Sequence, residues 1–336
     1  MSPRRSMSLP SALVFVTVVA SGCTAKYIRA TTNENVTSTP ERIARGGYLV
    51  NQAMACGACH TPREGGALLG GERADRYLAG NAFELPSEGL ALWIPNLTPD
   101  VETGLGGWSD DEIMRAIRDG VGRDGHLFFP MMPFSSYAHL ADEDLRSIVA
   151  YLRSVPPLEN PRTIAKNRVG VFVGFLVNRG VMAHVPARDV PPPPRPEQDQ
   201  VKYGEYVMRL GHCWECHSAT GSGPRDLGEE GFFAGWDEAQ TFPGVGKIYF
   251  RNLTPDRQTG LGKYTREQLK QALRAGKRLD GKPWAAPMSF FAPHLSGLSD
   301  EDLDALVAFM KSVPPYANEI PERVLEPAYQ KWLSAE

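Results

Sequence analysis

The most restrictive feature of this 336-residue sequence is an internal duplication. The pattern Asn-Leu-Thr-Pro-Asp at residues 96–100 returns 156 positions later at 252–256, and Thr-Gly-Leu-Gly follows it each time. Other landmarks keep almost the same spacing: Ala-Gly at 79–80 and 234–235, and Ser-Val-Pro-Pro at 154–157 and 312–315. A module written twice along a chain is expected to fold twice. We therefore predict two tandem domains, at 41–158 and 201–316.

Three other segments flank or join these modules. Residues 159–200 form an interdomain segment, whose prolines at 191–194 favour a semi-rigid linker. Residues 317–336 form a C-terminal tail. At the other end, residues 1–22 combine two arginines with a short apolar run that carries no charge and cannot span a bilayer. That combination is typical of an export signal.

Cys23 follows directly on the small residues Ser21 and Gly22. A small-residue triplet that ends in cysteine resembles the lipobox of bacterial lipoproteins. We therefore expect a lipoprotein-type signal peptide at 1–22 and lipidation of Cys23 as the first residue of the mature chain. The alternatives are an ordinary cleaved signal or an uncleaved anchor, with Cys23 as a bystander. The interpretation that we prefer places the protein in the bacterial periplasm, anchored to the inner or the outer membrane.

Each module has the pattern of a helical domain. Helices are expected in equivalent places: after the capping-box pairs Ser109 with Glu112 and Thr265 with Gln268, over the periodic apolar stretches at 142–152 and 300–310, and over 45–55 and 204–210, running into the next motif. Strand patterns are scarce. We therefore predict an all-α fold made of two similar domains.

The sequence Cys-x-x-Cys-His occurs once in each module, as Cys56, Cys59 and His60 and as Cys213, Cys216 and His217. Two thiols about one helical turn apart can each add to one vinyl group of the same haem, and the histidine that follows can bind the iron. A zinc site would need four ligands, and a thioredoxin-like site would need a βαβ setting, and neither context is present. The motifs therefore predict two covalently bound haem c groups.

The sixth iron ligand is predicted from the register between the modules. Met132 and Met288 each lie seven residues after an equivalent glycine, in loops rich in proline and aromatic residues. This count selects Met132 over its neighbour Met131. The alternative is bis-histidine ligation by His139 and His294, which also recur. We expect Met132 and Met288 to be metal ligands, together with His60 and His217.

With these residues in place, the sequence resembles the bacterial cytochrome c domains of alcohol dehydrogenase and gluconate dehydrogenase cytochrome subunits, and related free-standing dihaem cytochromes. The resemblance covers nearly the whole mature chain and rests on Gly-Gly-Tyr-Leu at 46–49, Ala-Gly at 79–80, the Asn-Leu-Thr-Pro-Asp loop with its Thr-Gly-Leu-Gly, Met-Pro at 132–133 and Ala-Tyr-Leu-Arg at 150–153. The dehydrogenase subunits usually carry three haem domains, whereas this chain has two. Ser289 replaces the proline that usually follows the ligand methionine. The resemblance implies tandem cytochrome c-like domains.

Composition and ligation together narrow the function. The 36 Lys and Arg against 39 Asp and Glu leave a formal charge of −3, which lacks the basic excess of a nucleic-acid binder. Iron with six ligands has no open position for a substrate. We therefore expect no catalytic residues and an electron carrier that exchanges single electrons with redox partner proteins, either free or as a subunit of a dehydrogenase or oxidase chain. The alternative is a peroxidase-like dihaem enzyme with one labile haem ligand.

A basic cluster follows the second Thr-Gly-Leu-Gly motif, consisting of Lys263, Arg266, Lys270, Arg274, Lys277, Arg278 and Lys282. Its simplest interpretation is a solvated helix face. The alternative is a docking surface for an acidic redox partner near the second haem, because complementary charge speeds encounter.

Overall fold

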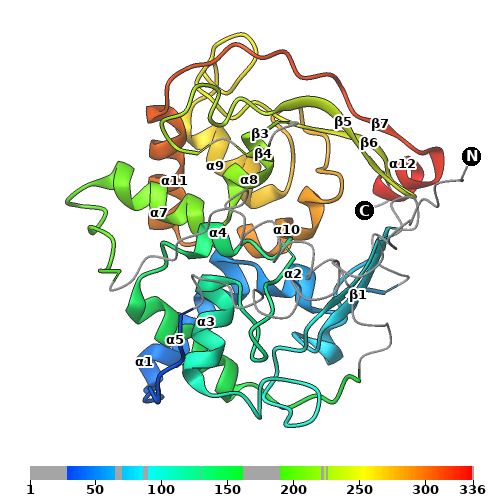
Figure 1. Ribbon diagram of the computed structural model, residues 1–336. Helices are drawn as coiled ribbons and strands as arrows, with labels where there is room; N and C mark the ends of the chain where they lie inside the picture. Colours follow the sequence, from blue (N-terminus) through cyan, green and yellow to red (C-terminus); the bar gives the residue numbers. More distant parts are fainter. Residues whose placement is uncertain are drawn as a thin grey trace, which may run out of the picture.

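The computed structural model describes residues 29–64, 70–85, 90–129, 131–161, 190–220, 223–224 and 226–334. The first repeat contains α1 (Pro40–Tyr48), the π-helical turn η1 (Leu49–Ala53), α2 (Cys56–His60), the 3-10 turn η2 (Ala74–Arg76), β1 (Asn81–Leu85), β2 (Leu90–Ile94), α3 (Asp110–Asp119), α4 (Phe134–Tyr137) and α5 (Asp142–Ser154). In Figure 1 it occupies the lower half of the molecule, coloured blue to green.

The second repeat follows the same order in the upper half of Figure 1. It contains α7 (Gln200–Leu210), α8 (Cys213–His217), β3 (Ala219–Thr220), β4 (Gly223–Pro224), β5 (Trp236–Phe242), β6 (Gly246–Phe250), α9 (Arg266–Ala275), α10 (Met288–Leu295) and α11 (Asp300–Ser312). The tail adds β7 (Val324–Leu325), which pairs with β6, and α12 (Pro327–Leu333). None of the helices in the described ranges is both long and apolar enough to cross a membrane.

The sequence predicted the starts of the helices well. α3 begins after Ser109 and α9 after Thr265, and both have a complete capping box in which side chain and backbone bond reciprocally. α5 and α11 begin with the predicted acidic turns. The helix expected over 45–55 is wrong in detail, because α1 ends at Tyr48 and the chain continues as a π-helical turn. The cysteines therefore lie on separate short helices.

Short strands accompany the helices. β1 and β2 form an antiparallel hairpin in the first repeat, and β5, β6 and β7 form a three-stranded antiparallel sheet in the second. Helices supply most of two core clusters, whereas a third cluster in the second repeat joins Ile248 of β6 to Tyr329 of α12. These strands were not predicted from the sequence. β3 and β4 pair over only two residues each.

In each repeat, a glycine of the first helix lets that helix pack closely on the last helix of the repeat, α1 on α5 and α7 on α11. A Cβ atom on Gly46 of α1 would lie 1.9 Å from the carbonyl oxygen of Ser147 in α5. A Cβ atom on Gly204 of α7 would lie 1.9 Å from the carbonyl oxygen of Ala305 in α11. Both obstacles are helix backbone, which cannot move aside without parting the helices. The two repeats therefore share one close helix crossing.

We expect Gly46→Ala to lower the free energy of unfolding by about 1–3 kcal/mol, which is the typical cost of overpacking a well-packed contact. Urea denaturation of the holoprotein measures this. Gly47→Ala is the matched control, since its Cβ would meet only the Tyr151 ring, at 3.1 Å. Equal midpoints for the two variants would contradict the close crossing.

The two repeats pack against each other with approximate two-fold symmetry. Tyr48 of the first repeat donates a hydrogen bond to Asp302 of the second, and the equivalent Tyr206 donates to Asp144 of the first at 2.7 Å. One hydrophobic core also runs through both, since buried Tyr206 packs with the core of the first repeat. This reciprocity is what an isologous dimer interface shows, here within a single chain.

Candidate functional site

The two Cys-x-x-Cys-His segments are the short helices α2 and α8. Each is preceded by a residue in the left-handed conformation, Ala55 with φ of 51° and His212 with φ of 42°. This turn separates the attachment helix from the preceding helix. None of Cys56, Cys59, Cys213 and Cys216 is in a disulfide, so the four thiols remain available for attachment.

The histidine of each motif is oriented by a backbone carbonyl. The Nδ1 atom of His60 lies 2.8 Å from the carbonyl oxygen of Pro95, and that of His217 lies 2.8 Å from the carbonyl oxygen of Arg251. A carbonyl only accepts, so Nδ1 carries the proton and Nε2 keeps its lone pair for a metal. Burial lowers the pKa of His60 to about 4 and also lowers the pKa of His217, which favours the neutral imidazole that binds iron.

The repeated Asn-Leu-Thr-Pro-Asp loop holds that carbonyl in place. Asn96 directly follows Pro95, and its side-chain amide donates to the Leu158 carbonyl at 2.6 Å and to Thr103 Oγ1 at 3.1 Å. Its side-chain oxygen accepts the N–H of Thr98 at 2.9 Å. Asn252 makes the equivalent bonds in the second repeat. The duplicated motif therefore positions the histidine.

The repeated Ala-Gly pair fixes the histidine from its backbone side. The N–H of Gly80 donates to the His60 carbonyl at 2.7 Å, and the N–H of Gly235 donates to the His217 carbonyl at 2.7 Å. Both glycines have positive φ, 88° and 79°, which a side chain would strain. The role of this Ala-Gly pair, and that of the Pro95 and Arg251 carbonyls, was not predicted from the sequence. The recurrence of the pair at nearly constant spacing was the signal that could have indicated its role.

Met132 and Met288 occupy equivalent places in the chain of each repeat, at the start of the helix that follows the methionine loop. Both are half-buried and pack against the same core as Cys56. Met132 lies just before α4, and Met288 begins α10. Met131, the neighbour that the register rejected, is 38% exposed. The register and the burial therefore favour the same methionine.

The two histidines of the alternative ligand set lie differently. His139 is exposed. His294 is buried, but its Nδ1 atom lies 2.6 Å from the Asn51 carbonyl oxygen and its Nε2 atom 2.8 Å from Glu72 Oε1. Both of its ring nitrogens are therefore engaged by the first repeat. His294 is thus held by the first repeat, whereas His139 faces solvent.

The C-terminal tail secures the second methionine loop. The hydroxyl of Tyr329 in α12 is almost fully buried and accepts the N–H of Ala286 at 2.9 Å, two residues before Met288. Arg323 donates to the Pro283 carbonyl at 2.9 Å. Ser289 stands where the first repeat has Pro133. The tail thus restrains a loop that lacks the proline of the first repeat.

These residues fit a covalently attached haem in each repeat. Two free thiols one helical turn apart precede a histidine whose Nε2 has no hydrogen-bond partner in the described part of the chain. Each repeat also has a half-buried methionine thioether, and both thioethers pack against the core that Cys56 contacts. The thiols and the bonded histidine recur at matching positions in both repeats.

The sequence matches the Cytochrome c family over residues 43–156 and again over 201–314. The chain belongs to the cytochrome c family. Its two cytochrome c domains carry two covalently bound haem c groups, attached at the cysteines of α2 and α8. Electron transfer is the role of this family, and the chain shares it through both repeats.

Three relatives show how the chain compares. It is 30% identical to the fructose dehydrogenase cytochrome subunit of Gluconobacter japonicus, over 86% of this chain and 57% of the relative. It is 28% identical to the gluconate 2-dehydrogenase cytochrome c subunit of Pantoea cypripedii, over 81% of this chain and 59% of the relative. The chain thus spans less than two thirds of these subunits. A dihaem cytochrome c-type protein of Cereibacter sphaeroides is 26% identical over 93% of this chain and 99% of the relative.

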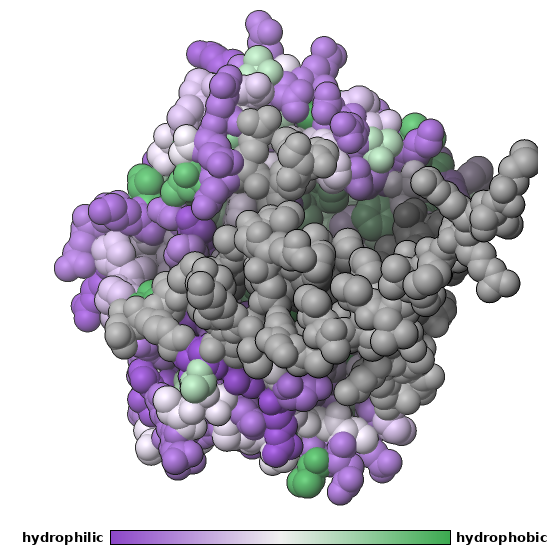
Figure 2. Space-filling view, viewed as in Figure 1, coloured by the Kyte–Doolittle hydropathy of each residue, from purple (hydrophilic) through white to green (hydrophobic). Residues whose placement is uncertain are grey.

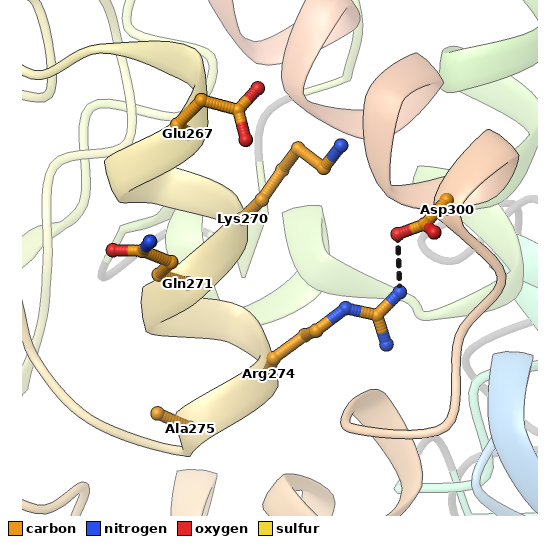
Figure 3. Close-up of a pocket in the computed structure, with 6 residues that line it drawn as sticks. All are labelled: Glu267, Lys270, Gln271, Arg274, Ala275 and Asp300. Atoms are coloured by element: carbon orange, nitrogen blue, oxygen red, sulfur yellow. Dashed lines mark hydrogen bonds and ion pairs between the residues drawn. The ribbon is translucent and has the colours of Figure 1, made fainter.

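Four residues of the basic cluster pair with acidic residues of the second domain or the tail. Figure 3 shows Lys270 and Arg274 projecting from α9 towards the start of α11, where Arg274 bonds Asp300. Arg274 and Asp300 are 2.7 Å apart, and Lys270 lies 2.7 Å from Asp304. Further pairs join Arg278 to Glu322 and Lys282 to Asp280. The cluster therefore offers a partner less net charge than its sequence suggests, which favours the solvated-face interpretation.

The described part of the face in Figure 2 is mostly hydrophilic, with hydrophobic residues scattered singly. Such scattered residues are ordinary on a protein surface. The described part of this face therefore shows no large apolar patch. Cys23, the predicted lipidation site, lies outside the described residues.

Proposed function

We propose that the chain carries single electrons between redox proteins of the bacterial envelope, holding one electron at each of two haem sites. The observation that carries this proposal is the duplicated histidine geometry, in which Nδ1 is bonded to a carbonyl and Nε2 is left for iron. When bound, haem iron exchanges one electron between its ferric and ferrous states. The chain's own residues fix the ligands around it, and we assign no catalytic residue.

We propose His60 with Met132, and His217 with Met288, as the two iron ligand sets. A neutral thioether favours ferrous over ferric iron and so raises the reduction potential above that of a bis-histidine site. The half-burial of both methionines supports this assignment, as does the engagement of His294 elsewhere. A closed ligand set leaves no position for a substrate.

A test of the carrier role separates it from the peroxidase-like alternative. We expect the reduced, purified protein to give up its electrons to a one-electron acceptor such as ferricyanide, monitored by haem absorbance. We also expect no sustained peroxide consumption when hydrogen peroxide and a reductant are supplied together. Continuous peroxide turnover by the unmodified protein would establish the enzyme alternative instead.

The partners are proposed from the relatives. The names of the compared subunits describe cytochromes of fructose and gluconate dehydrogenases. We propose that a dehydrogenase supplies electrons to this chain and that another cytochrome or an oxidase accepts them. Copurification from native membranes identifies the partner directly.

We also propose domain boundaries at 41–158 and 201–316, and an all-α class in which the short strands are peripheral.

We propose that the chain is a periplasmic lipoprotein anchored to a membrane through Cys23. Its first described residues bind the first repeat, since Arg29 lies 2.6 Å from Asp111 and 3.4 Å from Asp119 in α3. The backbone N–H of Val36 also donates to Asp110 at 2.8 Å. A lipid at Cys23 would therefore keep α3 close to the membrane surface.

Cys23→Ser should move the protein from the membrane fraction to the soluble fraction, because it removes the residue that would carry the anchoring acyl chains. Fractionation and intact mass measure this. The haem content should stay at two per chain, since Cys23 is not an attachment cysteine. An unmodified N-terminus in the native protein would contradict the lipoprotein proposal.

A further inference from the structure

The helix that follows each methionine contacts the other repeat, at the helices that lead into or form its haem attachment motif. α4, which follows Met132, contacts α7 of the second repeat, and α10, which begins at Met288, contacts η1 and α2 of the first. Figure 1 shows α2, α4 and α10 gathered in the middle of the molecule, between the repeats. The exchange follows the same approximate two-fold symmetry as the tyrosine–aspartate bonds described above.

The first methionine loop is bound by Glu215 of α8. Glu215 Oε1 accepts hydrogen bonds from Ser135 Oγ at 2.8 Å and from Ser136 Oγ at 2.7 Å. These serines lie three and four residues after Met132. Ser136 is 1% exposed and also accepts the indole N–H of Trp214 at 2.7 Å. A carboxylate of the second haem motif therefore holds the ligand loop of the first haem.

The second methionine loop is bound through His294 of α10, six residues after Met288. His294 donates from Nδ1 to the Asn51 carbonyl at 2.6 Å and from Nε2 to Glu72 Oε1 at 2.8 Å. Burial by itself lowers the pKa of His294, but the bond to Glu72 and its charge outweigh burial, and the pKa is raised. Asn51 lies in η1, next to the first haem motif. Residues of the first repeat therefore hold the ligand loop of the second haem.

We propose that each haem's methionine ligand is positioned by the other repeat, with Glu215 acting on Met132 and Glu72, through His294, acting on Met288. The inference rests on the proposed ligand sets. Glu215 and Glu72 are positioning residues, because they act through the serines and the histidine of the loops and do not touch the iron. A neutral thioether is a weak ligand, so its binding to iron depends on how firmly its loop is held.

The experiment uses methionine variants to observe one haem at a time. In Met288→Ala, the weak sulfur-to-iron absorption of the ferric holoprotein comes from the first haem alone, and in Met132→Ala it comes from the second. Glu215→Ala or Glu72→Ala is added to each background. Imidazole is titrated until the absorption disappears, and the midpoint reports how firmly the methionine is held.

We expect each glutamate variant to lower the imidazole midpoint at the haem of the other repeat. Glu215→Ala should lower the imidazole midpoint at the first haem by about tenfold, because a lost hydrogen bond to a charged group is worth at least that factor. It should change the midpoint of the second haem, to whose motif it belongs, by much less. Glu72→Ala should do the reverse.

Conservative variants separate the hydrogen bond from a general loss of folding. Glu215→Gln and Glu72→Gln keep an accepting oxygen but lose the charge, and should restore part of each midpoint. Ser135→Ala, in the opposite repeat, should weaken the first haem in the same direction as Glu215→Ala. Effects confined to each glutamate's own repeat, or equal at both haems, would overturn the proposal. Absence of the sulfur-to-iron absorption from the unmodified protein would instead refute the ligand sets.

Discussion

Met132→Ala and Met288→Ala should each remove about half of the weak sulfur-to-iron absorption of the ferric protein, because each removes one of two equivalent thioether ligands. Each variant should also gain one haem that binds imidazole or cyanide freely. The reduction potential of the affected haem should fall, since the ligand that favours ferrous iron is gone. Absorption spectroscopy and potentiometric titration of the purified holoproteins measure these changes.

The sequence supplies its own control for this experiment. Met131→Ala replaces the exposed neighbour of Met132 and should leave the absorption and both potentials unchanged. His139→Ala and His294→Ala test the bis-histidine alternative. Loss of a low-spin haem in these histidine variants, with full absorption retained in both methionine variants, would assign the sixth ligands to histidine.

The second large effect concerns attachment. Replacing both Cys56 and Cys59 with alanine should reduce covalent haem from two groups per chain to one, because no thiol remains for the vinyl groups of that haem. Replacing Cys213 and Cys216 should have the same effect on the second domain. Intact mass under denaturing conditions counts the attached groups. The chain should also become less stable, because a bound cofactor stabilises the folded state by mass action.

The interface predicts how far this loss extends. One hydrophobic core runs through both repeats, and each methionine loop is bound by the other repeat. Removing one haem should therefore also lower the imidazole midpoint of the remaining haem. A remaining haem that is identical to the unmodified protein in absorption and midpoint would show that the repeats are independent.

The motifs that could be predicted from the sequence are those set by local chemistry. The capping boxes at Ser109 and Thr265 started helices as expected, because a cap bonds residues only three positions apart. The haem attachment motifs were recognised for the same reason, since Cys-x-x-Cys-His is complete within five residues. The duplication then doubled the evidence for each motif.

The features that could not be predicted depend on contacts between distant segments. The break before Cys56 places Ala55 in the left-handed conformation, which alanine itself does not favour. The strand β7 forms only because the tail returns to β6. The pairing of Lys270 with Asp304 likewise needs α9 and α11 to pack together. None of these contacts leaves a periodic pattern in the sequence.

The bonds between the repeats were also beyond sequence analysis. Glu215 lies inside a haem motif, at a position where the first repeat has Ala58, so the duplication gave no signal for it. His294 was considered only as a competing iron ligand. Its actual partners, Asn51 and Glu72, are more than 200 residues away in the chain.

The most direct test of the central claim is a coulometric redox titration of the purified protein, with its haem content counted by intact mass. We expect two attached haems and two electrons per chain, taken up in one-electron steps by two low-spin sites, with no consumption of added peroxide. A chain that takes up one electron, or that holds one high-spin haem and turns over peroxide, would contradict it.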